Sequence, residues 1–402
     1  MSIEGFSVRF VASEADIPAA LWESCFPPPL EGRWWYQTLE QSSLEDQFTF
    51  TYAVIQTGER LVGIAPLFLM TVPLGLAVPA WLRPILSVPA RHLPFLADPL
   101  ALFVGSPCAD EGTVGILPEW DRQSVLAVLQ DALEAEARRR NAAMIIWKDF
   151  PDTWQPDLAW LATERHLFRL TGFPGTVIDI PGASKTEYYA SLTSKQRTTL
   201  KRKVKRSHER APLDTEVIQN PDAPMLEQIT ALFQQTYLKA STKFERLDRR
   251  FFAAVAAKPA THFVLMRERR SRAIVAFMLC FEVGSRMINK YIGIDYTLPR
   301  DWMLYFRLWD AALDWCFARG ATSVQSGQTG YSAKIEIGHR LVPLTNWCWH
   351  RSSLLRAAFG LFAKRISWRT LDRDLANFLS AHPEADAIQR AQLAVGGDDC
   401  EG

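Results

Sequence analysis

One order of predicted elements occurs twice in this chain, and it constrains the fold more than any other feature. In each half, a β-hairpin is followed by a helix that begins at a tryptophan and ends in arginine, and then by one more strand. The spacing of about 200 residues indicates an internal duplication, and strands grouped in this way predict an α+β fold of two modules. The predicted elements are the hairpins Phe48–Thr71 and Thr261–Val283, the helices Trp120–Arg140 and Trp302–Arg319, and the strands Ala142–Trp147 and Thr322–Gln325.

The length and composition agree with two modules. A chain of 402 residues is too long for one compact core. Its six cysteines are spread along the sequence without a C-x-x-C pair, which argues against a metal site or a disulfide framework. Reduced thiols of this kind are typical of a cytosolic protein. The N-terminus has no basic region followed by an apolar core, so we predict no signal peptide.

The segment from Ser184 to Arg210 predicts a strongly basic helix. Ser184 and Glu187 have the spacing of a capping box, which marks the start of the helix. The net charge of the whole chain is only +1, so this positive charge is local. It fits a solvated helix face that joins two halves, or a binding site for a polyanion such as phosphate, tRNA or an anionic lipid head. Its basic residues are Lys195, Arg197, Lys201, Arg202, Lys203, Lys205, Arg206 and Arg210.

The stretch from Val72 to Val104 is apolar and rich in proline. Prolines at positions 73, 79, 84, 89, 94 and 99 exclude a transmembrane helix, because each one removes a helical hydrogen bond. The stretch is therefore either an insertion packed on its domain or a loop that contacts a membrane or an acyl chain. In the second case Arg83 and Arg91 would face lipid phosphates.

A second basic segment lies near the C-terminus. Residues from Ser352 to Trp368 predict an amphipathic helix with arginine and lysine beside leucine and phenylalanine. Such a helix either packs on the body of the protein or lies on an anionic membrane. The last residues, Gly396 to Gly402, predict a disordered tail.

Two motifs carry a resemblance to a known family. The basic segment reads Y-x-x-x-L-x-x-K-x-R-x-x-L-K-R-K from Tyr188 to Lys203. Later, Tyr291–Asp295 is followed by the glycine-rich turn Gln325–Gly330 and by Tyr331 and Lys334. With the order of elements, these motifs resemble tandem GNAT proteins of the FemAB/FemX-like branch. The resemblance implies two mixed-sheet GNAT modules and transfer of an acyl group to an amine. It covers residues 150–350 in sequence and the N-terminal half by element order only.

The resemblance divides the chain into four parts. Residues 1–183 form an N-terminal GNAT-like module, and 184–210 form the basic helix that connects the modules or opens the second one. Residues 211–350 form the C-terminal module, and 351–402 form the amphipathic helix and tail. One feature departs from GNAT enzymes that bind coenzyme A, because the segment from Tyr296 to Trp302 before the main helix contains no glycine.

The chemistry of amine acylation needs a base for the amine and donors for the carbonyl. Asp295 is the first candidate base and Glu282 the second, whereas Tyr291 and Tyr331 are candidates for protonating the leaving group or orienting the acyl chain. The alternatives are a turn carboxylate for Asp295 and ordinary packing for the tyrosines. Candidate ligands of the substrate or donor are Lys195, Arg197, Lys201, Arg202, Arg300, Gly327, Gln328, Lys334 and His339. No histidine pair suggests a metal site.

The prediction for function is an N-acyltransferase that moves an acyl group from acyl-CoA or another thioester to a primary amine, with a lipid-linked acceptor as one option. One alternative is a FemX-like transferase that uses aminoacyl-tRNA on a cell-wall precursor. The other is a binding protein that retains the fold without the chemistry. We expect no tightly bound cofactor, acyl-CoA as the co-substrate, tRNA as a less favoured partner and no DNA. The expected location is the cytoplasm, or the inner face of the membrane.

Overall fold

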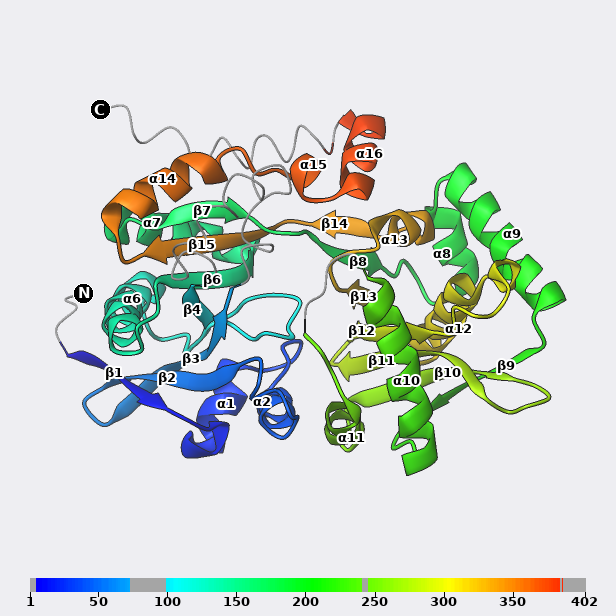
Figure 1. Ribbon diagram of the computed structural model, residues 1–402, viewed down its shortest axis with the longest axis horizontal. Helices are drawn as coiled ribbons and strands as arrows, with labels where there is room; N and C mark the ends of the chain where they lie inside the picture. Colours follow the sequence, from blue (N-terminus) through cyan, green and yellow to red (C-terminus); the bar gives the residue numbers. More distant parts are fainter. Residues whose placement is uncertain (1–4, 73–98, 241–244, 384, 386–402) are drawn as a thin grey trace, which may run out of the picture. The chain divides into compact units, whose positions relative to one another are not determined.

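The computed structural model describes residues 5–72, 99–240, 245–383 and 385, and the chain divides into two compact units (Figure 1). Unit 1 comprises Met1–Phe26, Glu45–Pro174 and Val342–Gly402, and unit 2 comprises Pro27–Leu44 and Gly175–Leu341. Each unit is therefore discontinuous in sequence. The proline-rich stretch at 73–98 and the tail from Gly396 lie outside the described residues, so the predictions made for them stay predictions.

The sheet of unit 1 has the strand order β1-β2-β3-β4-β6-β15-β7, with β5 beside β3. Its one parallel pair among the described strands is β4 with β6, and the other neighbours are antiparallel. The strands are β1 (Phe6–Val11), β2 (Thr49–Thr57), β3 (Arg60–Thr71), β4 (Leu100–Val104), β5 (Gly115–Ile116), β6 (Met144–Pro151), β7 (Phe168–Thr171) and β15 (Leu344–His350).

The sheet of unit 2 has the order β14-β8-β13-β12-β11-β10-β9. Here β12 and β13 are parallel, and the pairs from β9 to β12 and from β13 to β8 are antiparallel. The strands are β8 (Gly175–Asp179), β9 (Leu213–Ile218), β10 (Thr261–Glu268), β11 (Ile274–Val283), β12 (Arg286–Ile294), β13 (Ser323–Ser326) and β14 (Arg340–Val342).

The two sheets repeat one arrangement, as the sequence predicted. Four antiparallel strands are followed by a helix and a strand parallel to the fourth, and two further strands complete each sheet. In each sheet, the inner of these two further strands comes from the part of the chain that mainly builds the other unit. β8 follows β7 directly in sequence but belongs to the sheet of unit 2, and β15 follows β14 but belongs to the sheet of unit 1.

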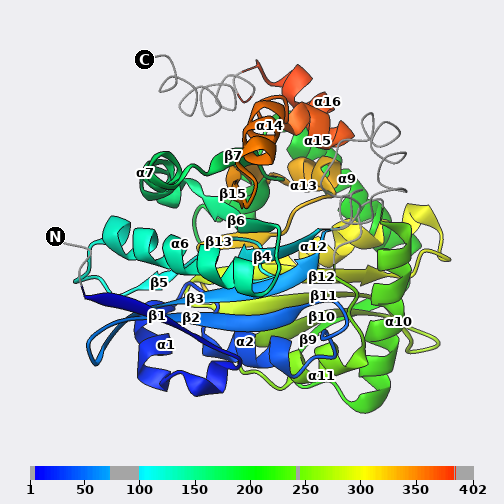
Figure 2. The same ribbon diagram turned by 60° about the vertical axis from the view of Figure 1, so that its left-hand side comes forward.

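One long helix covers a face of each sheet (Figure 2). In unit 1, α6 (Arg122–Arg139) begins at the side-chain cap of Asp121 and buries Val125, Leu129 and Leu133 against the sheet. In unit 2, α12 (Leu304–Ala318) packs against β9–β12. The other helices of unit 1 are α1 (Ala19–Cys25), α7 (Gln155–Arg165), α14 (Ser353–Ala363), α15 (Trp368–Leu371) and α16 (Arg373–Ala381).

The remaining helices of unit 2 include both parts of the basic segment. We predicted one helix from Ser184, but the chain forms two, because Leu192 is extended and Thr193 begins a new capping box with Gln196. The predicted cap of Ser184 on Glu187 is present. The helices are α2 (Arg33–Glu40), α8 (Lys185–Ser191), α9 (Ser194–Arg210), α10 (Ala223–Lys239), α11 (Arg249–Ala256) and α13 (Tyr331–Ile337).

Three boundaries differ from the predictions. The helix predicted from Trp302 starts at Leu304, after the short 3-10 turn Arg300–Trp302. The helix predicted to end at Trp368 ends at Ala363. The predicted contiguous modules differ from the observed units, since residues 27–44 belong to unit 2 and residues from Val342 belong to unit 1. Among the helices within the described ranges, none combines the length and apolar character that a bilayer crossing requires.

Candidate functional site

The parallel strands of unit 2 separate at their carboxyl ends, and this is the candidate site. β12 and β13 pair from Arg286 with Ser323 to Asn289 with Ser326. β13 then ends, whereas residues 290–294 of β12 continue without a partner on that strand. We call this place, bounded by residues 289–294 and 326–330, the unit 2 fork. Ligands of open sheets with parallel strands bind beyond the carboxyl ends of those strands.

A β-bulge lies at the start of the fork. In the pairing of β11 with β12, Leu279 is opposite Tyr291 and Cys280 is opposite Asn289, so Lys290 is the extra residue. A bulge of this kind breaks the alternation of side chains and redirects them, and bulges are frequent beside active sites.

The bulge directs two neighbouring side chains toward α2 and α11. The Lys290 ammonium lies over the ring of Trp35 in α2, 4.8 Å from its centroid. The Tyr291 ring packs edge-on against Phe251 in α11, with 5.6 Å between centroids. A regular strand would place these two side chains on opposite faces of the sheet.

Lys290 forms an ion pair with Glu31 over 3.3 Å, and the lysine side chain is only 1% exposed. Burial opposes ionisation of Glu31, but the charges of Lys290 and Arg286 outweigh it and hold the pKa of the carboxyl below its ordinary value. Arg286 also donates to the side-chain oxygen of Gln325 over 2.5 Å. The charges of two cations therefore act on one carboxylate beside the fork, and of these groups Lys290 is the most deeply buried.

Tyr291 also makes a polar contact: its hydroxyl donates to the carboxylate of Glu245. A tyrosine bonded to a carboxylate can pass a proton in either direction, which is the requirement for general acid–base chemistry. The rings of Phe233 and Phe251 hold the tyrosine edge-on.

The β13 side of the fork is polar and buried. Thr176 of β8 donates to the carbonyl of Ser326 over 2.9 Å, and Asn289 donates to the Ser326 hydroxyl over 3.0 Å. The amide oxygen of Asn289 has no hydrogen-bond partner within the described part of the chain. A buried acceptor without a donor is unusual and marks a position where a ligand N–H group would be favourable.

The backbone of β12 offers a donor on the same edge. Ile294 N–H donates to the Thr236 hydroxyl of α10 over 3.3 Å, and Asp295 N–H donates to the Val275 carbonyl of β11. Since N–H groups alternate along a strand, the N–H of Ile292 points to the same edge as that of Ile294, away from β11. That edge is where β13 has ended.

The glycine-rich turn leads from the β13 side of the fork into α13. Gly330 adopts a left-handed φ of 64°, and the buried Lys334 donates to the carbonyl of Gly327. His339 contacts the Lys334 carbonyl through Nδ1 over 2.9 Å. Burial, and then the Lys334 charge, lower the pKa of His339 to about 3, so this imidazole is neutral.

The predicted site residues fall into two groups. Tyr291, Gly327 and Gln328 lie at the fork, and Lys334 of α13 reaches it through its bond to the Gly327 carbonyl. Tyr331, the first residue of α13, is buried in the core. The imidazole of His339 is buried against Trp309.

The two predicted bases are not brought together. Asp295 is aligned with Val275 at one end of the β11–β12 hairpin and Glu282 lies at the other, roughly 20 Å away at strand spacing. Asp295 accepts hydrogen bonds from the Thr297 N–H and hydroxyl at 2.9 and 2.6 Å, the geometry of a turn carboxylate. Glu282 pairs with Arg319 over 2.8 Å.

Some cations of the basic segment make contacts within the protein, and others are exposed to solvent. Arg197 donates to the carbonyls of Tyr189 and Leu192, and Lys201 lies 4.8 Å from the Tyr189 ring. Four other cations of α9 are exposed, have no acidic partner within the described residues and share one helix face by their spacing. We call them the α9 cation row: Lys195, Arg202, Arg206 and Arg210. Arg300 is exposed in the 3-10 turn before α12.

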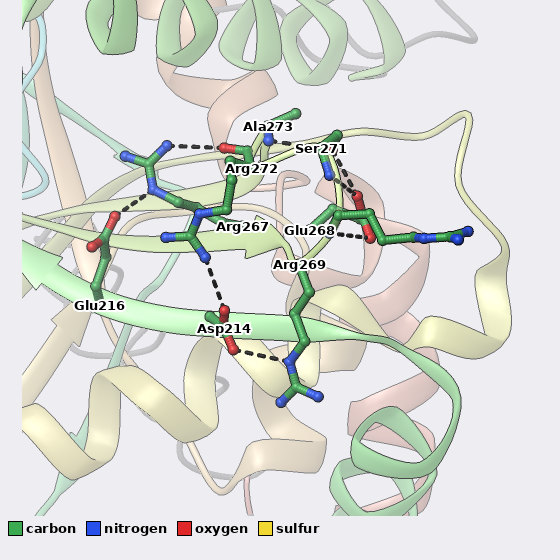
Figure 3. A network of polar contacts seen from close by, with 9 residues as sticks. Asp214, Glu216, Arg267, Glu268, Arg269, Ser271, Arg272 and Ala273 are labelled. Atoms are coloured by element: carbon green, nitrogen blue, oxygen red, sulfur yellow. Dashed lines mark hydrogen bonds and ion pairs between the residues drawn. The ribbon is translucent and has the colours of Figure 1, made fainter.

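A second cluster of charges, at the β10–β11 turn, is satisfied internally (Figure 3). Asp214 of β9 pairs with Arg269 and Arg272 over 3.0 and 2.9 Å. Glu268 accepts bonds from the N–H groups of Arg270 and Ser271, which lower its pKa to about 2. Both carboxylates bind groups of the β10–β11 turn, so this cluster stabilises the hairpin and is not a candidate site.

Sequence reasoning missed several residues of the fork. Glu31 is 259 positions away from Lys290, and no local pattern connects them. Thr176, Asn289 and Glu245 were also missed. Only the bulge left a local trace, as Asn289-Lys290-Tyr291 places polar residues beside each other in an otherwise apolar strand.

Comparisons with known proteins agree with this architecture. The FemAB-like family, described as peptidoglycan biosynthesis/recognition, matches residues 121–381. The crystal structure of FemX superposes with a TM-score of 0.56 at 12% identity, covering 88% of this chain and all of that one. A tandem GNAT protein from the clavulanic acid biosynthesis pathway gives 0.50 at 10% identity, covering 86% and 99%. At these identities the structures show the fold alone. No curated protein sequence matches the chain significantly.

Proposed function

The chain belongs to the FemAB-like family, and from this premise we propose that it transfers an acyl or aminoacyl group from a carrier to a primary amine at the unit 2 fork. The family and the fold support a transferase of cell-wall or envelope synthesis. The bulge of β12 carries the assignment to the fork. It places Lys290 and Tyr291 on one side of the strand at the point where β13 ends.

The proposed reaction uses groups that lie at the fork. The amine attacks the carbonyl carbon of the donor, a C–N bond forms, and the C–S or C–O bond to the carrier breaks. The Tyr291–Glu245 pair takes the amine proton and returns it to the leaving thiolate or alkoxide, which balances the step. The N–H of Ile292 holds the carbonyl oxygen while it carries negative charge. The free amide oxygen of Asn289 accepts from the attacking amine and so orients it.

The proposal admits two carriers for the transferred group. Acyl-CoA and aminoacyl-tRNA both carry phosphates, and the α9 cation row supports either as the group that positions the carrier. Lys334 and Arg300 are proposed as further ligands of the donor. A lipid-linked amine and a cell-wall precursor are the candidate acceptors.

The test starts with the donor. Full-length protein is heated with short- and long-chain acyl-CoA and, separately, with bulk aminoacyl-tRNA. A ligand at about 100 times its dissociation constant raises the free energy of unfolding by about 2.7 kcal/mol, a readily measured shift. The stabilising donor is then supplied with amine acceptors, and the amide product is measured by mass spectrometry.

Tyr291→Phe tests the site. We expect the rate of amide formation to fall about 100-fold with donor binding retained, since only the proton-transfer group is removed. Tyr52→Phe in β2 of unit 1 is the matched control and should retain the rate. Equal rates for Tyr291→Phe and the wild type would remove the fork as the site of chemistry. Donor binding without any amide product would favour a binding protein that retains the fold.

A further inference from the structure

Helix α14 of unit 1 is apolar on both sides, although only one side is packed. Its sequence, SLLRAAFGLFA, contains a single charged residue, and Ala363 is its only buried residue. A helix that is apolar all round is normally enclosed by protein or by lipid. In Figure 1, α14 runs along β7 and β15 at the surface of the unit, and its contacts are with these strands.

The inner side is fixed to the sheet at close range. A side chain at Gly360 would meet the Cβ atom of Phe168 of β7 at 3.3 Å, so the helix backbone rests directly on that strand. The ring of Phe359 packs against His350 of β15, with 5.6 Å between centroids. These contacts fix which side of the helix faces outward.

The outer side exposes two large leucines. Leu354 is 78% exposed and Leu361 is 69% exposed. They are two helical turns apart, about 10 Å, on one face, and the exposed Ala357 and Ala358 lie between them. Single exposed leucines are ordinary, but a row on the outer face of a helix with this composition marks an interaction surface.

Positive charge surrounds this apolar row. Residues 351–371 contain no aspartate or glutamate. Lys364 and Arg365 follow the helix directly and are exposed, without an acidic partner in the described part of the chain. Arg351 precedes it, exposed, and its guanidinium donates to the Asn141 side chain. Cations at both ends of an apolar helix face match a surface of acyl chains covered by anionic head groups.

We propose that α14 is a docking surface for an anionic membrane, with Leu354 and Leu361 inserted among the acyl chains and Lys364 and Arg365 against lipid phosphates. The protein would then bind at the membrane surface without spanning it. The inference is independent of the transfer reaction. It leaves the fork as described and adds a place where a lipid-linked substrate would be met.

Vesicle sedimentation of the full-length protein tests this surface. We expect binding to vesicles of phosphatidylglycerol and phosphatidylcholine in equal parts, weaker binding to phosphatidylcholine alone, and loss of the difference at high salt. The double variant Leu354→Ser/Leu361→Ser should bind the anionic vesicles at least about tenfold more weakly. Lys364→Ala/Arg365→Ala should remove the preference for anionic lipid.

The control is Leu238→Ser in α10, which removes a leucine of 70% exposure from another surface and should bind as the wild type does. All substituted side chains are exposed, so the melting temperatures should agree. The proposal fails if the wild type binds neither vesicle, or if the double leucine variant binds as tightly as the wild type. It also fails if light scattering shows a dimer that this variant dissociates, because α14 would then be an interface between two copies.

Discussion

The two units use one strand order but end their parallel pairs differently. In unit 1, β4 pairs with β6 up to its last residue, Val104 with Trp147. The loop that follows β4 lies against β6, because the Gly112 N–H donates to the Asp149 carbonyl over 2.8 Å. In unit 1, β6 continues to Pro151 beyond the end of β4, as β12 continues beyond β13 in unit 2. We call this place in unit 1, bounded by residues 104 and 148–151, the unit 1 fork. It differs from the unit 2 fork in that a loop of its own chain lies against it. The two units share one sheet arrangement and differ at the place where we propose that the substrates bind.

The lysines beside the two forks also differ in their exposure to solvent. Lys148 beside the unit 1 fork is 22% exposed in its side chain, pairs with Asp149 over 2.6 Å and also donates to a loop carbonyl. Lys290 beside the unit 2 fork is 1% exposed and packs on an indole ring. The carboxylates differ in the opposite sense, since the side chain of Glu31 is 16% and that of Asp149 8% exposed, so the contrast depends on the buried lysine of unit 2.

Lys290→Met gives the largest expected effect on this comparison. It leaves Glu31 ionised and poorly solvated, so the free energy of unfolding should fall by about 3–5 kcal/mol in urea titrations. Lys148→Met in unit 1 should cost less, about 1–2 kcal/mol. Glu31→Gln/Lys290→Met should recover most of the loss because it removes both charges. If the double variant were as unstable as Lys290→Met, the ion pair would not be the cause.

Gly112→Ala tests whether the unit 1 fork is filled. A Cβ atom there would lie 2.0 Å from the Lys148 carbonyl oxygen and 2.6 Å from the Phe150 ring, so we expect a loss of about 2 kcal/mol. Gly320→Ala is the control, since its Cβ meets nothing within 4 Å and only the left-handed φ costs energy, about 1 kcal/mol. Below its melting temperature, Gly112→Ala should form amide at the wild-type rate. A lower rate in the folded variant would place chemistry in unit 1.

The buried imidazole of unit 2 predicts a pH dependence. The pKa of His339 is about 3 against 6.5 for the ordinary side chain, so between these values the unfolded chain binds a proton that the native state does not. Stability therefore decreases as the pH falls below 6.5, by about 2 kcal/mol at pH 5.

Urea titrations from pH 7 to 5 measure this decrease, and His339→Asn should flatten it. His350→Asn in unit 1 is the comparison. Burial also lowers the pKa of His350, without so large a displacement, so its removal should change the slope less. Identical slopes for the wild type and His339→Asn would show that another group governs the acid response.

The smallest expected effect is on carrier binding, and it compares the arginines of α6 with those of α9. Arg138 and Arg139 of α6 are engaged by Glu134 and Glu136 at 3.1 and 2.6 Å, whereas Arg202 and Arg206 of α9 have no such partner within the described residues. Arg202→Ala/Arg206→Ala should weaken binding of the stabilising carrier about tenfold at low salt and reduce its salt dependence. Arg138→Ala/Arg139→Ala should leave carrier binding unchanged. Equal effects of the two double variants would indicate non-specific attraction.

Local pattern was sufficient for much of the fold. The hairpin of β2 and β3, the apolar side of α6 and the repeated order of elements were all readable, because each depends on neighbours a few residues apart. The break between α8 and α9 was also readable, since Thr193 and Gln196 have the spacing of a capping box. The prediction of a single helix overlooks this signal because it follows the basic residues alone.

The rest depended on partners distant in sequence. Nothing near β8 or β15 indicates that each completes the other unit's sheet, because a short strand does not encode its neighbour. The ion pair of Glu31 with Lys290 is hidden for the same reason.

The exchanged strands have a consequence for the order in which the protein folds. During synthesis, unit 1 lacks the strand between β6 and β7 until the ribosome has passed His350, near the end of the chain. Its sheet must wait with an open edge while the Gly175–Leu341 part of unit 2 is made, although N-terminal domains ordinarily fold first. The long sequence separation of these contacts slows folding. Neither half would be a self-sufficient product if the gene were cut between them, because each half holds a strand that the other sheet needs.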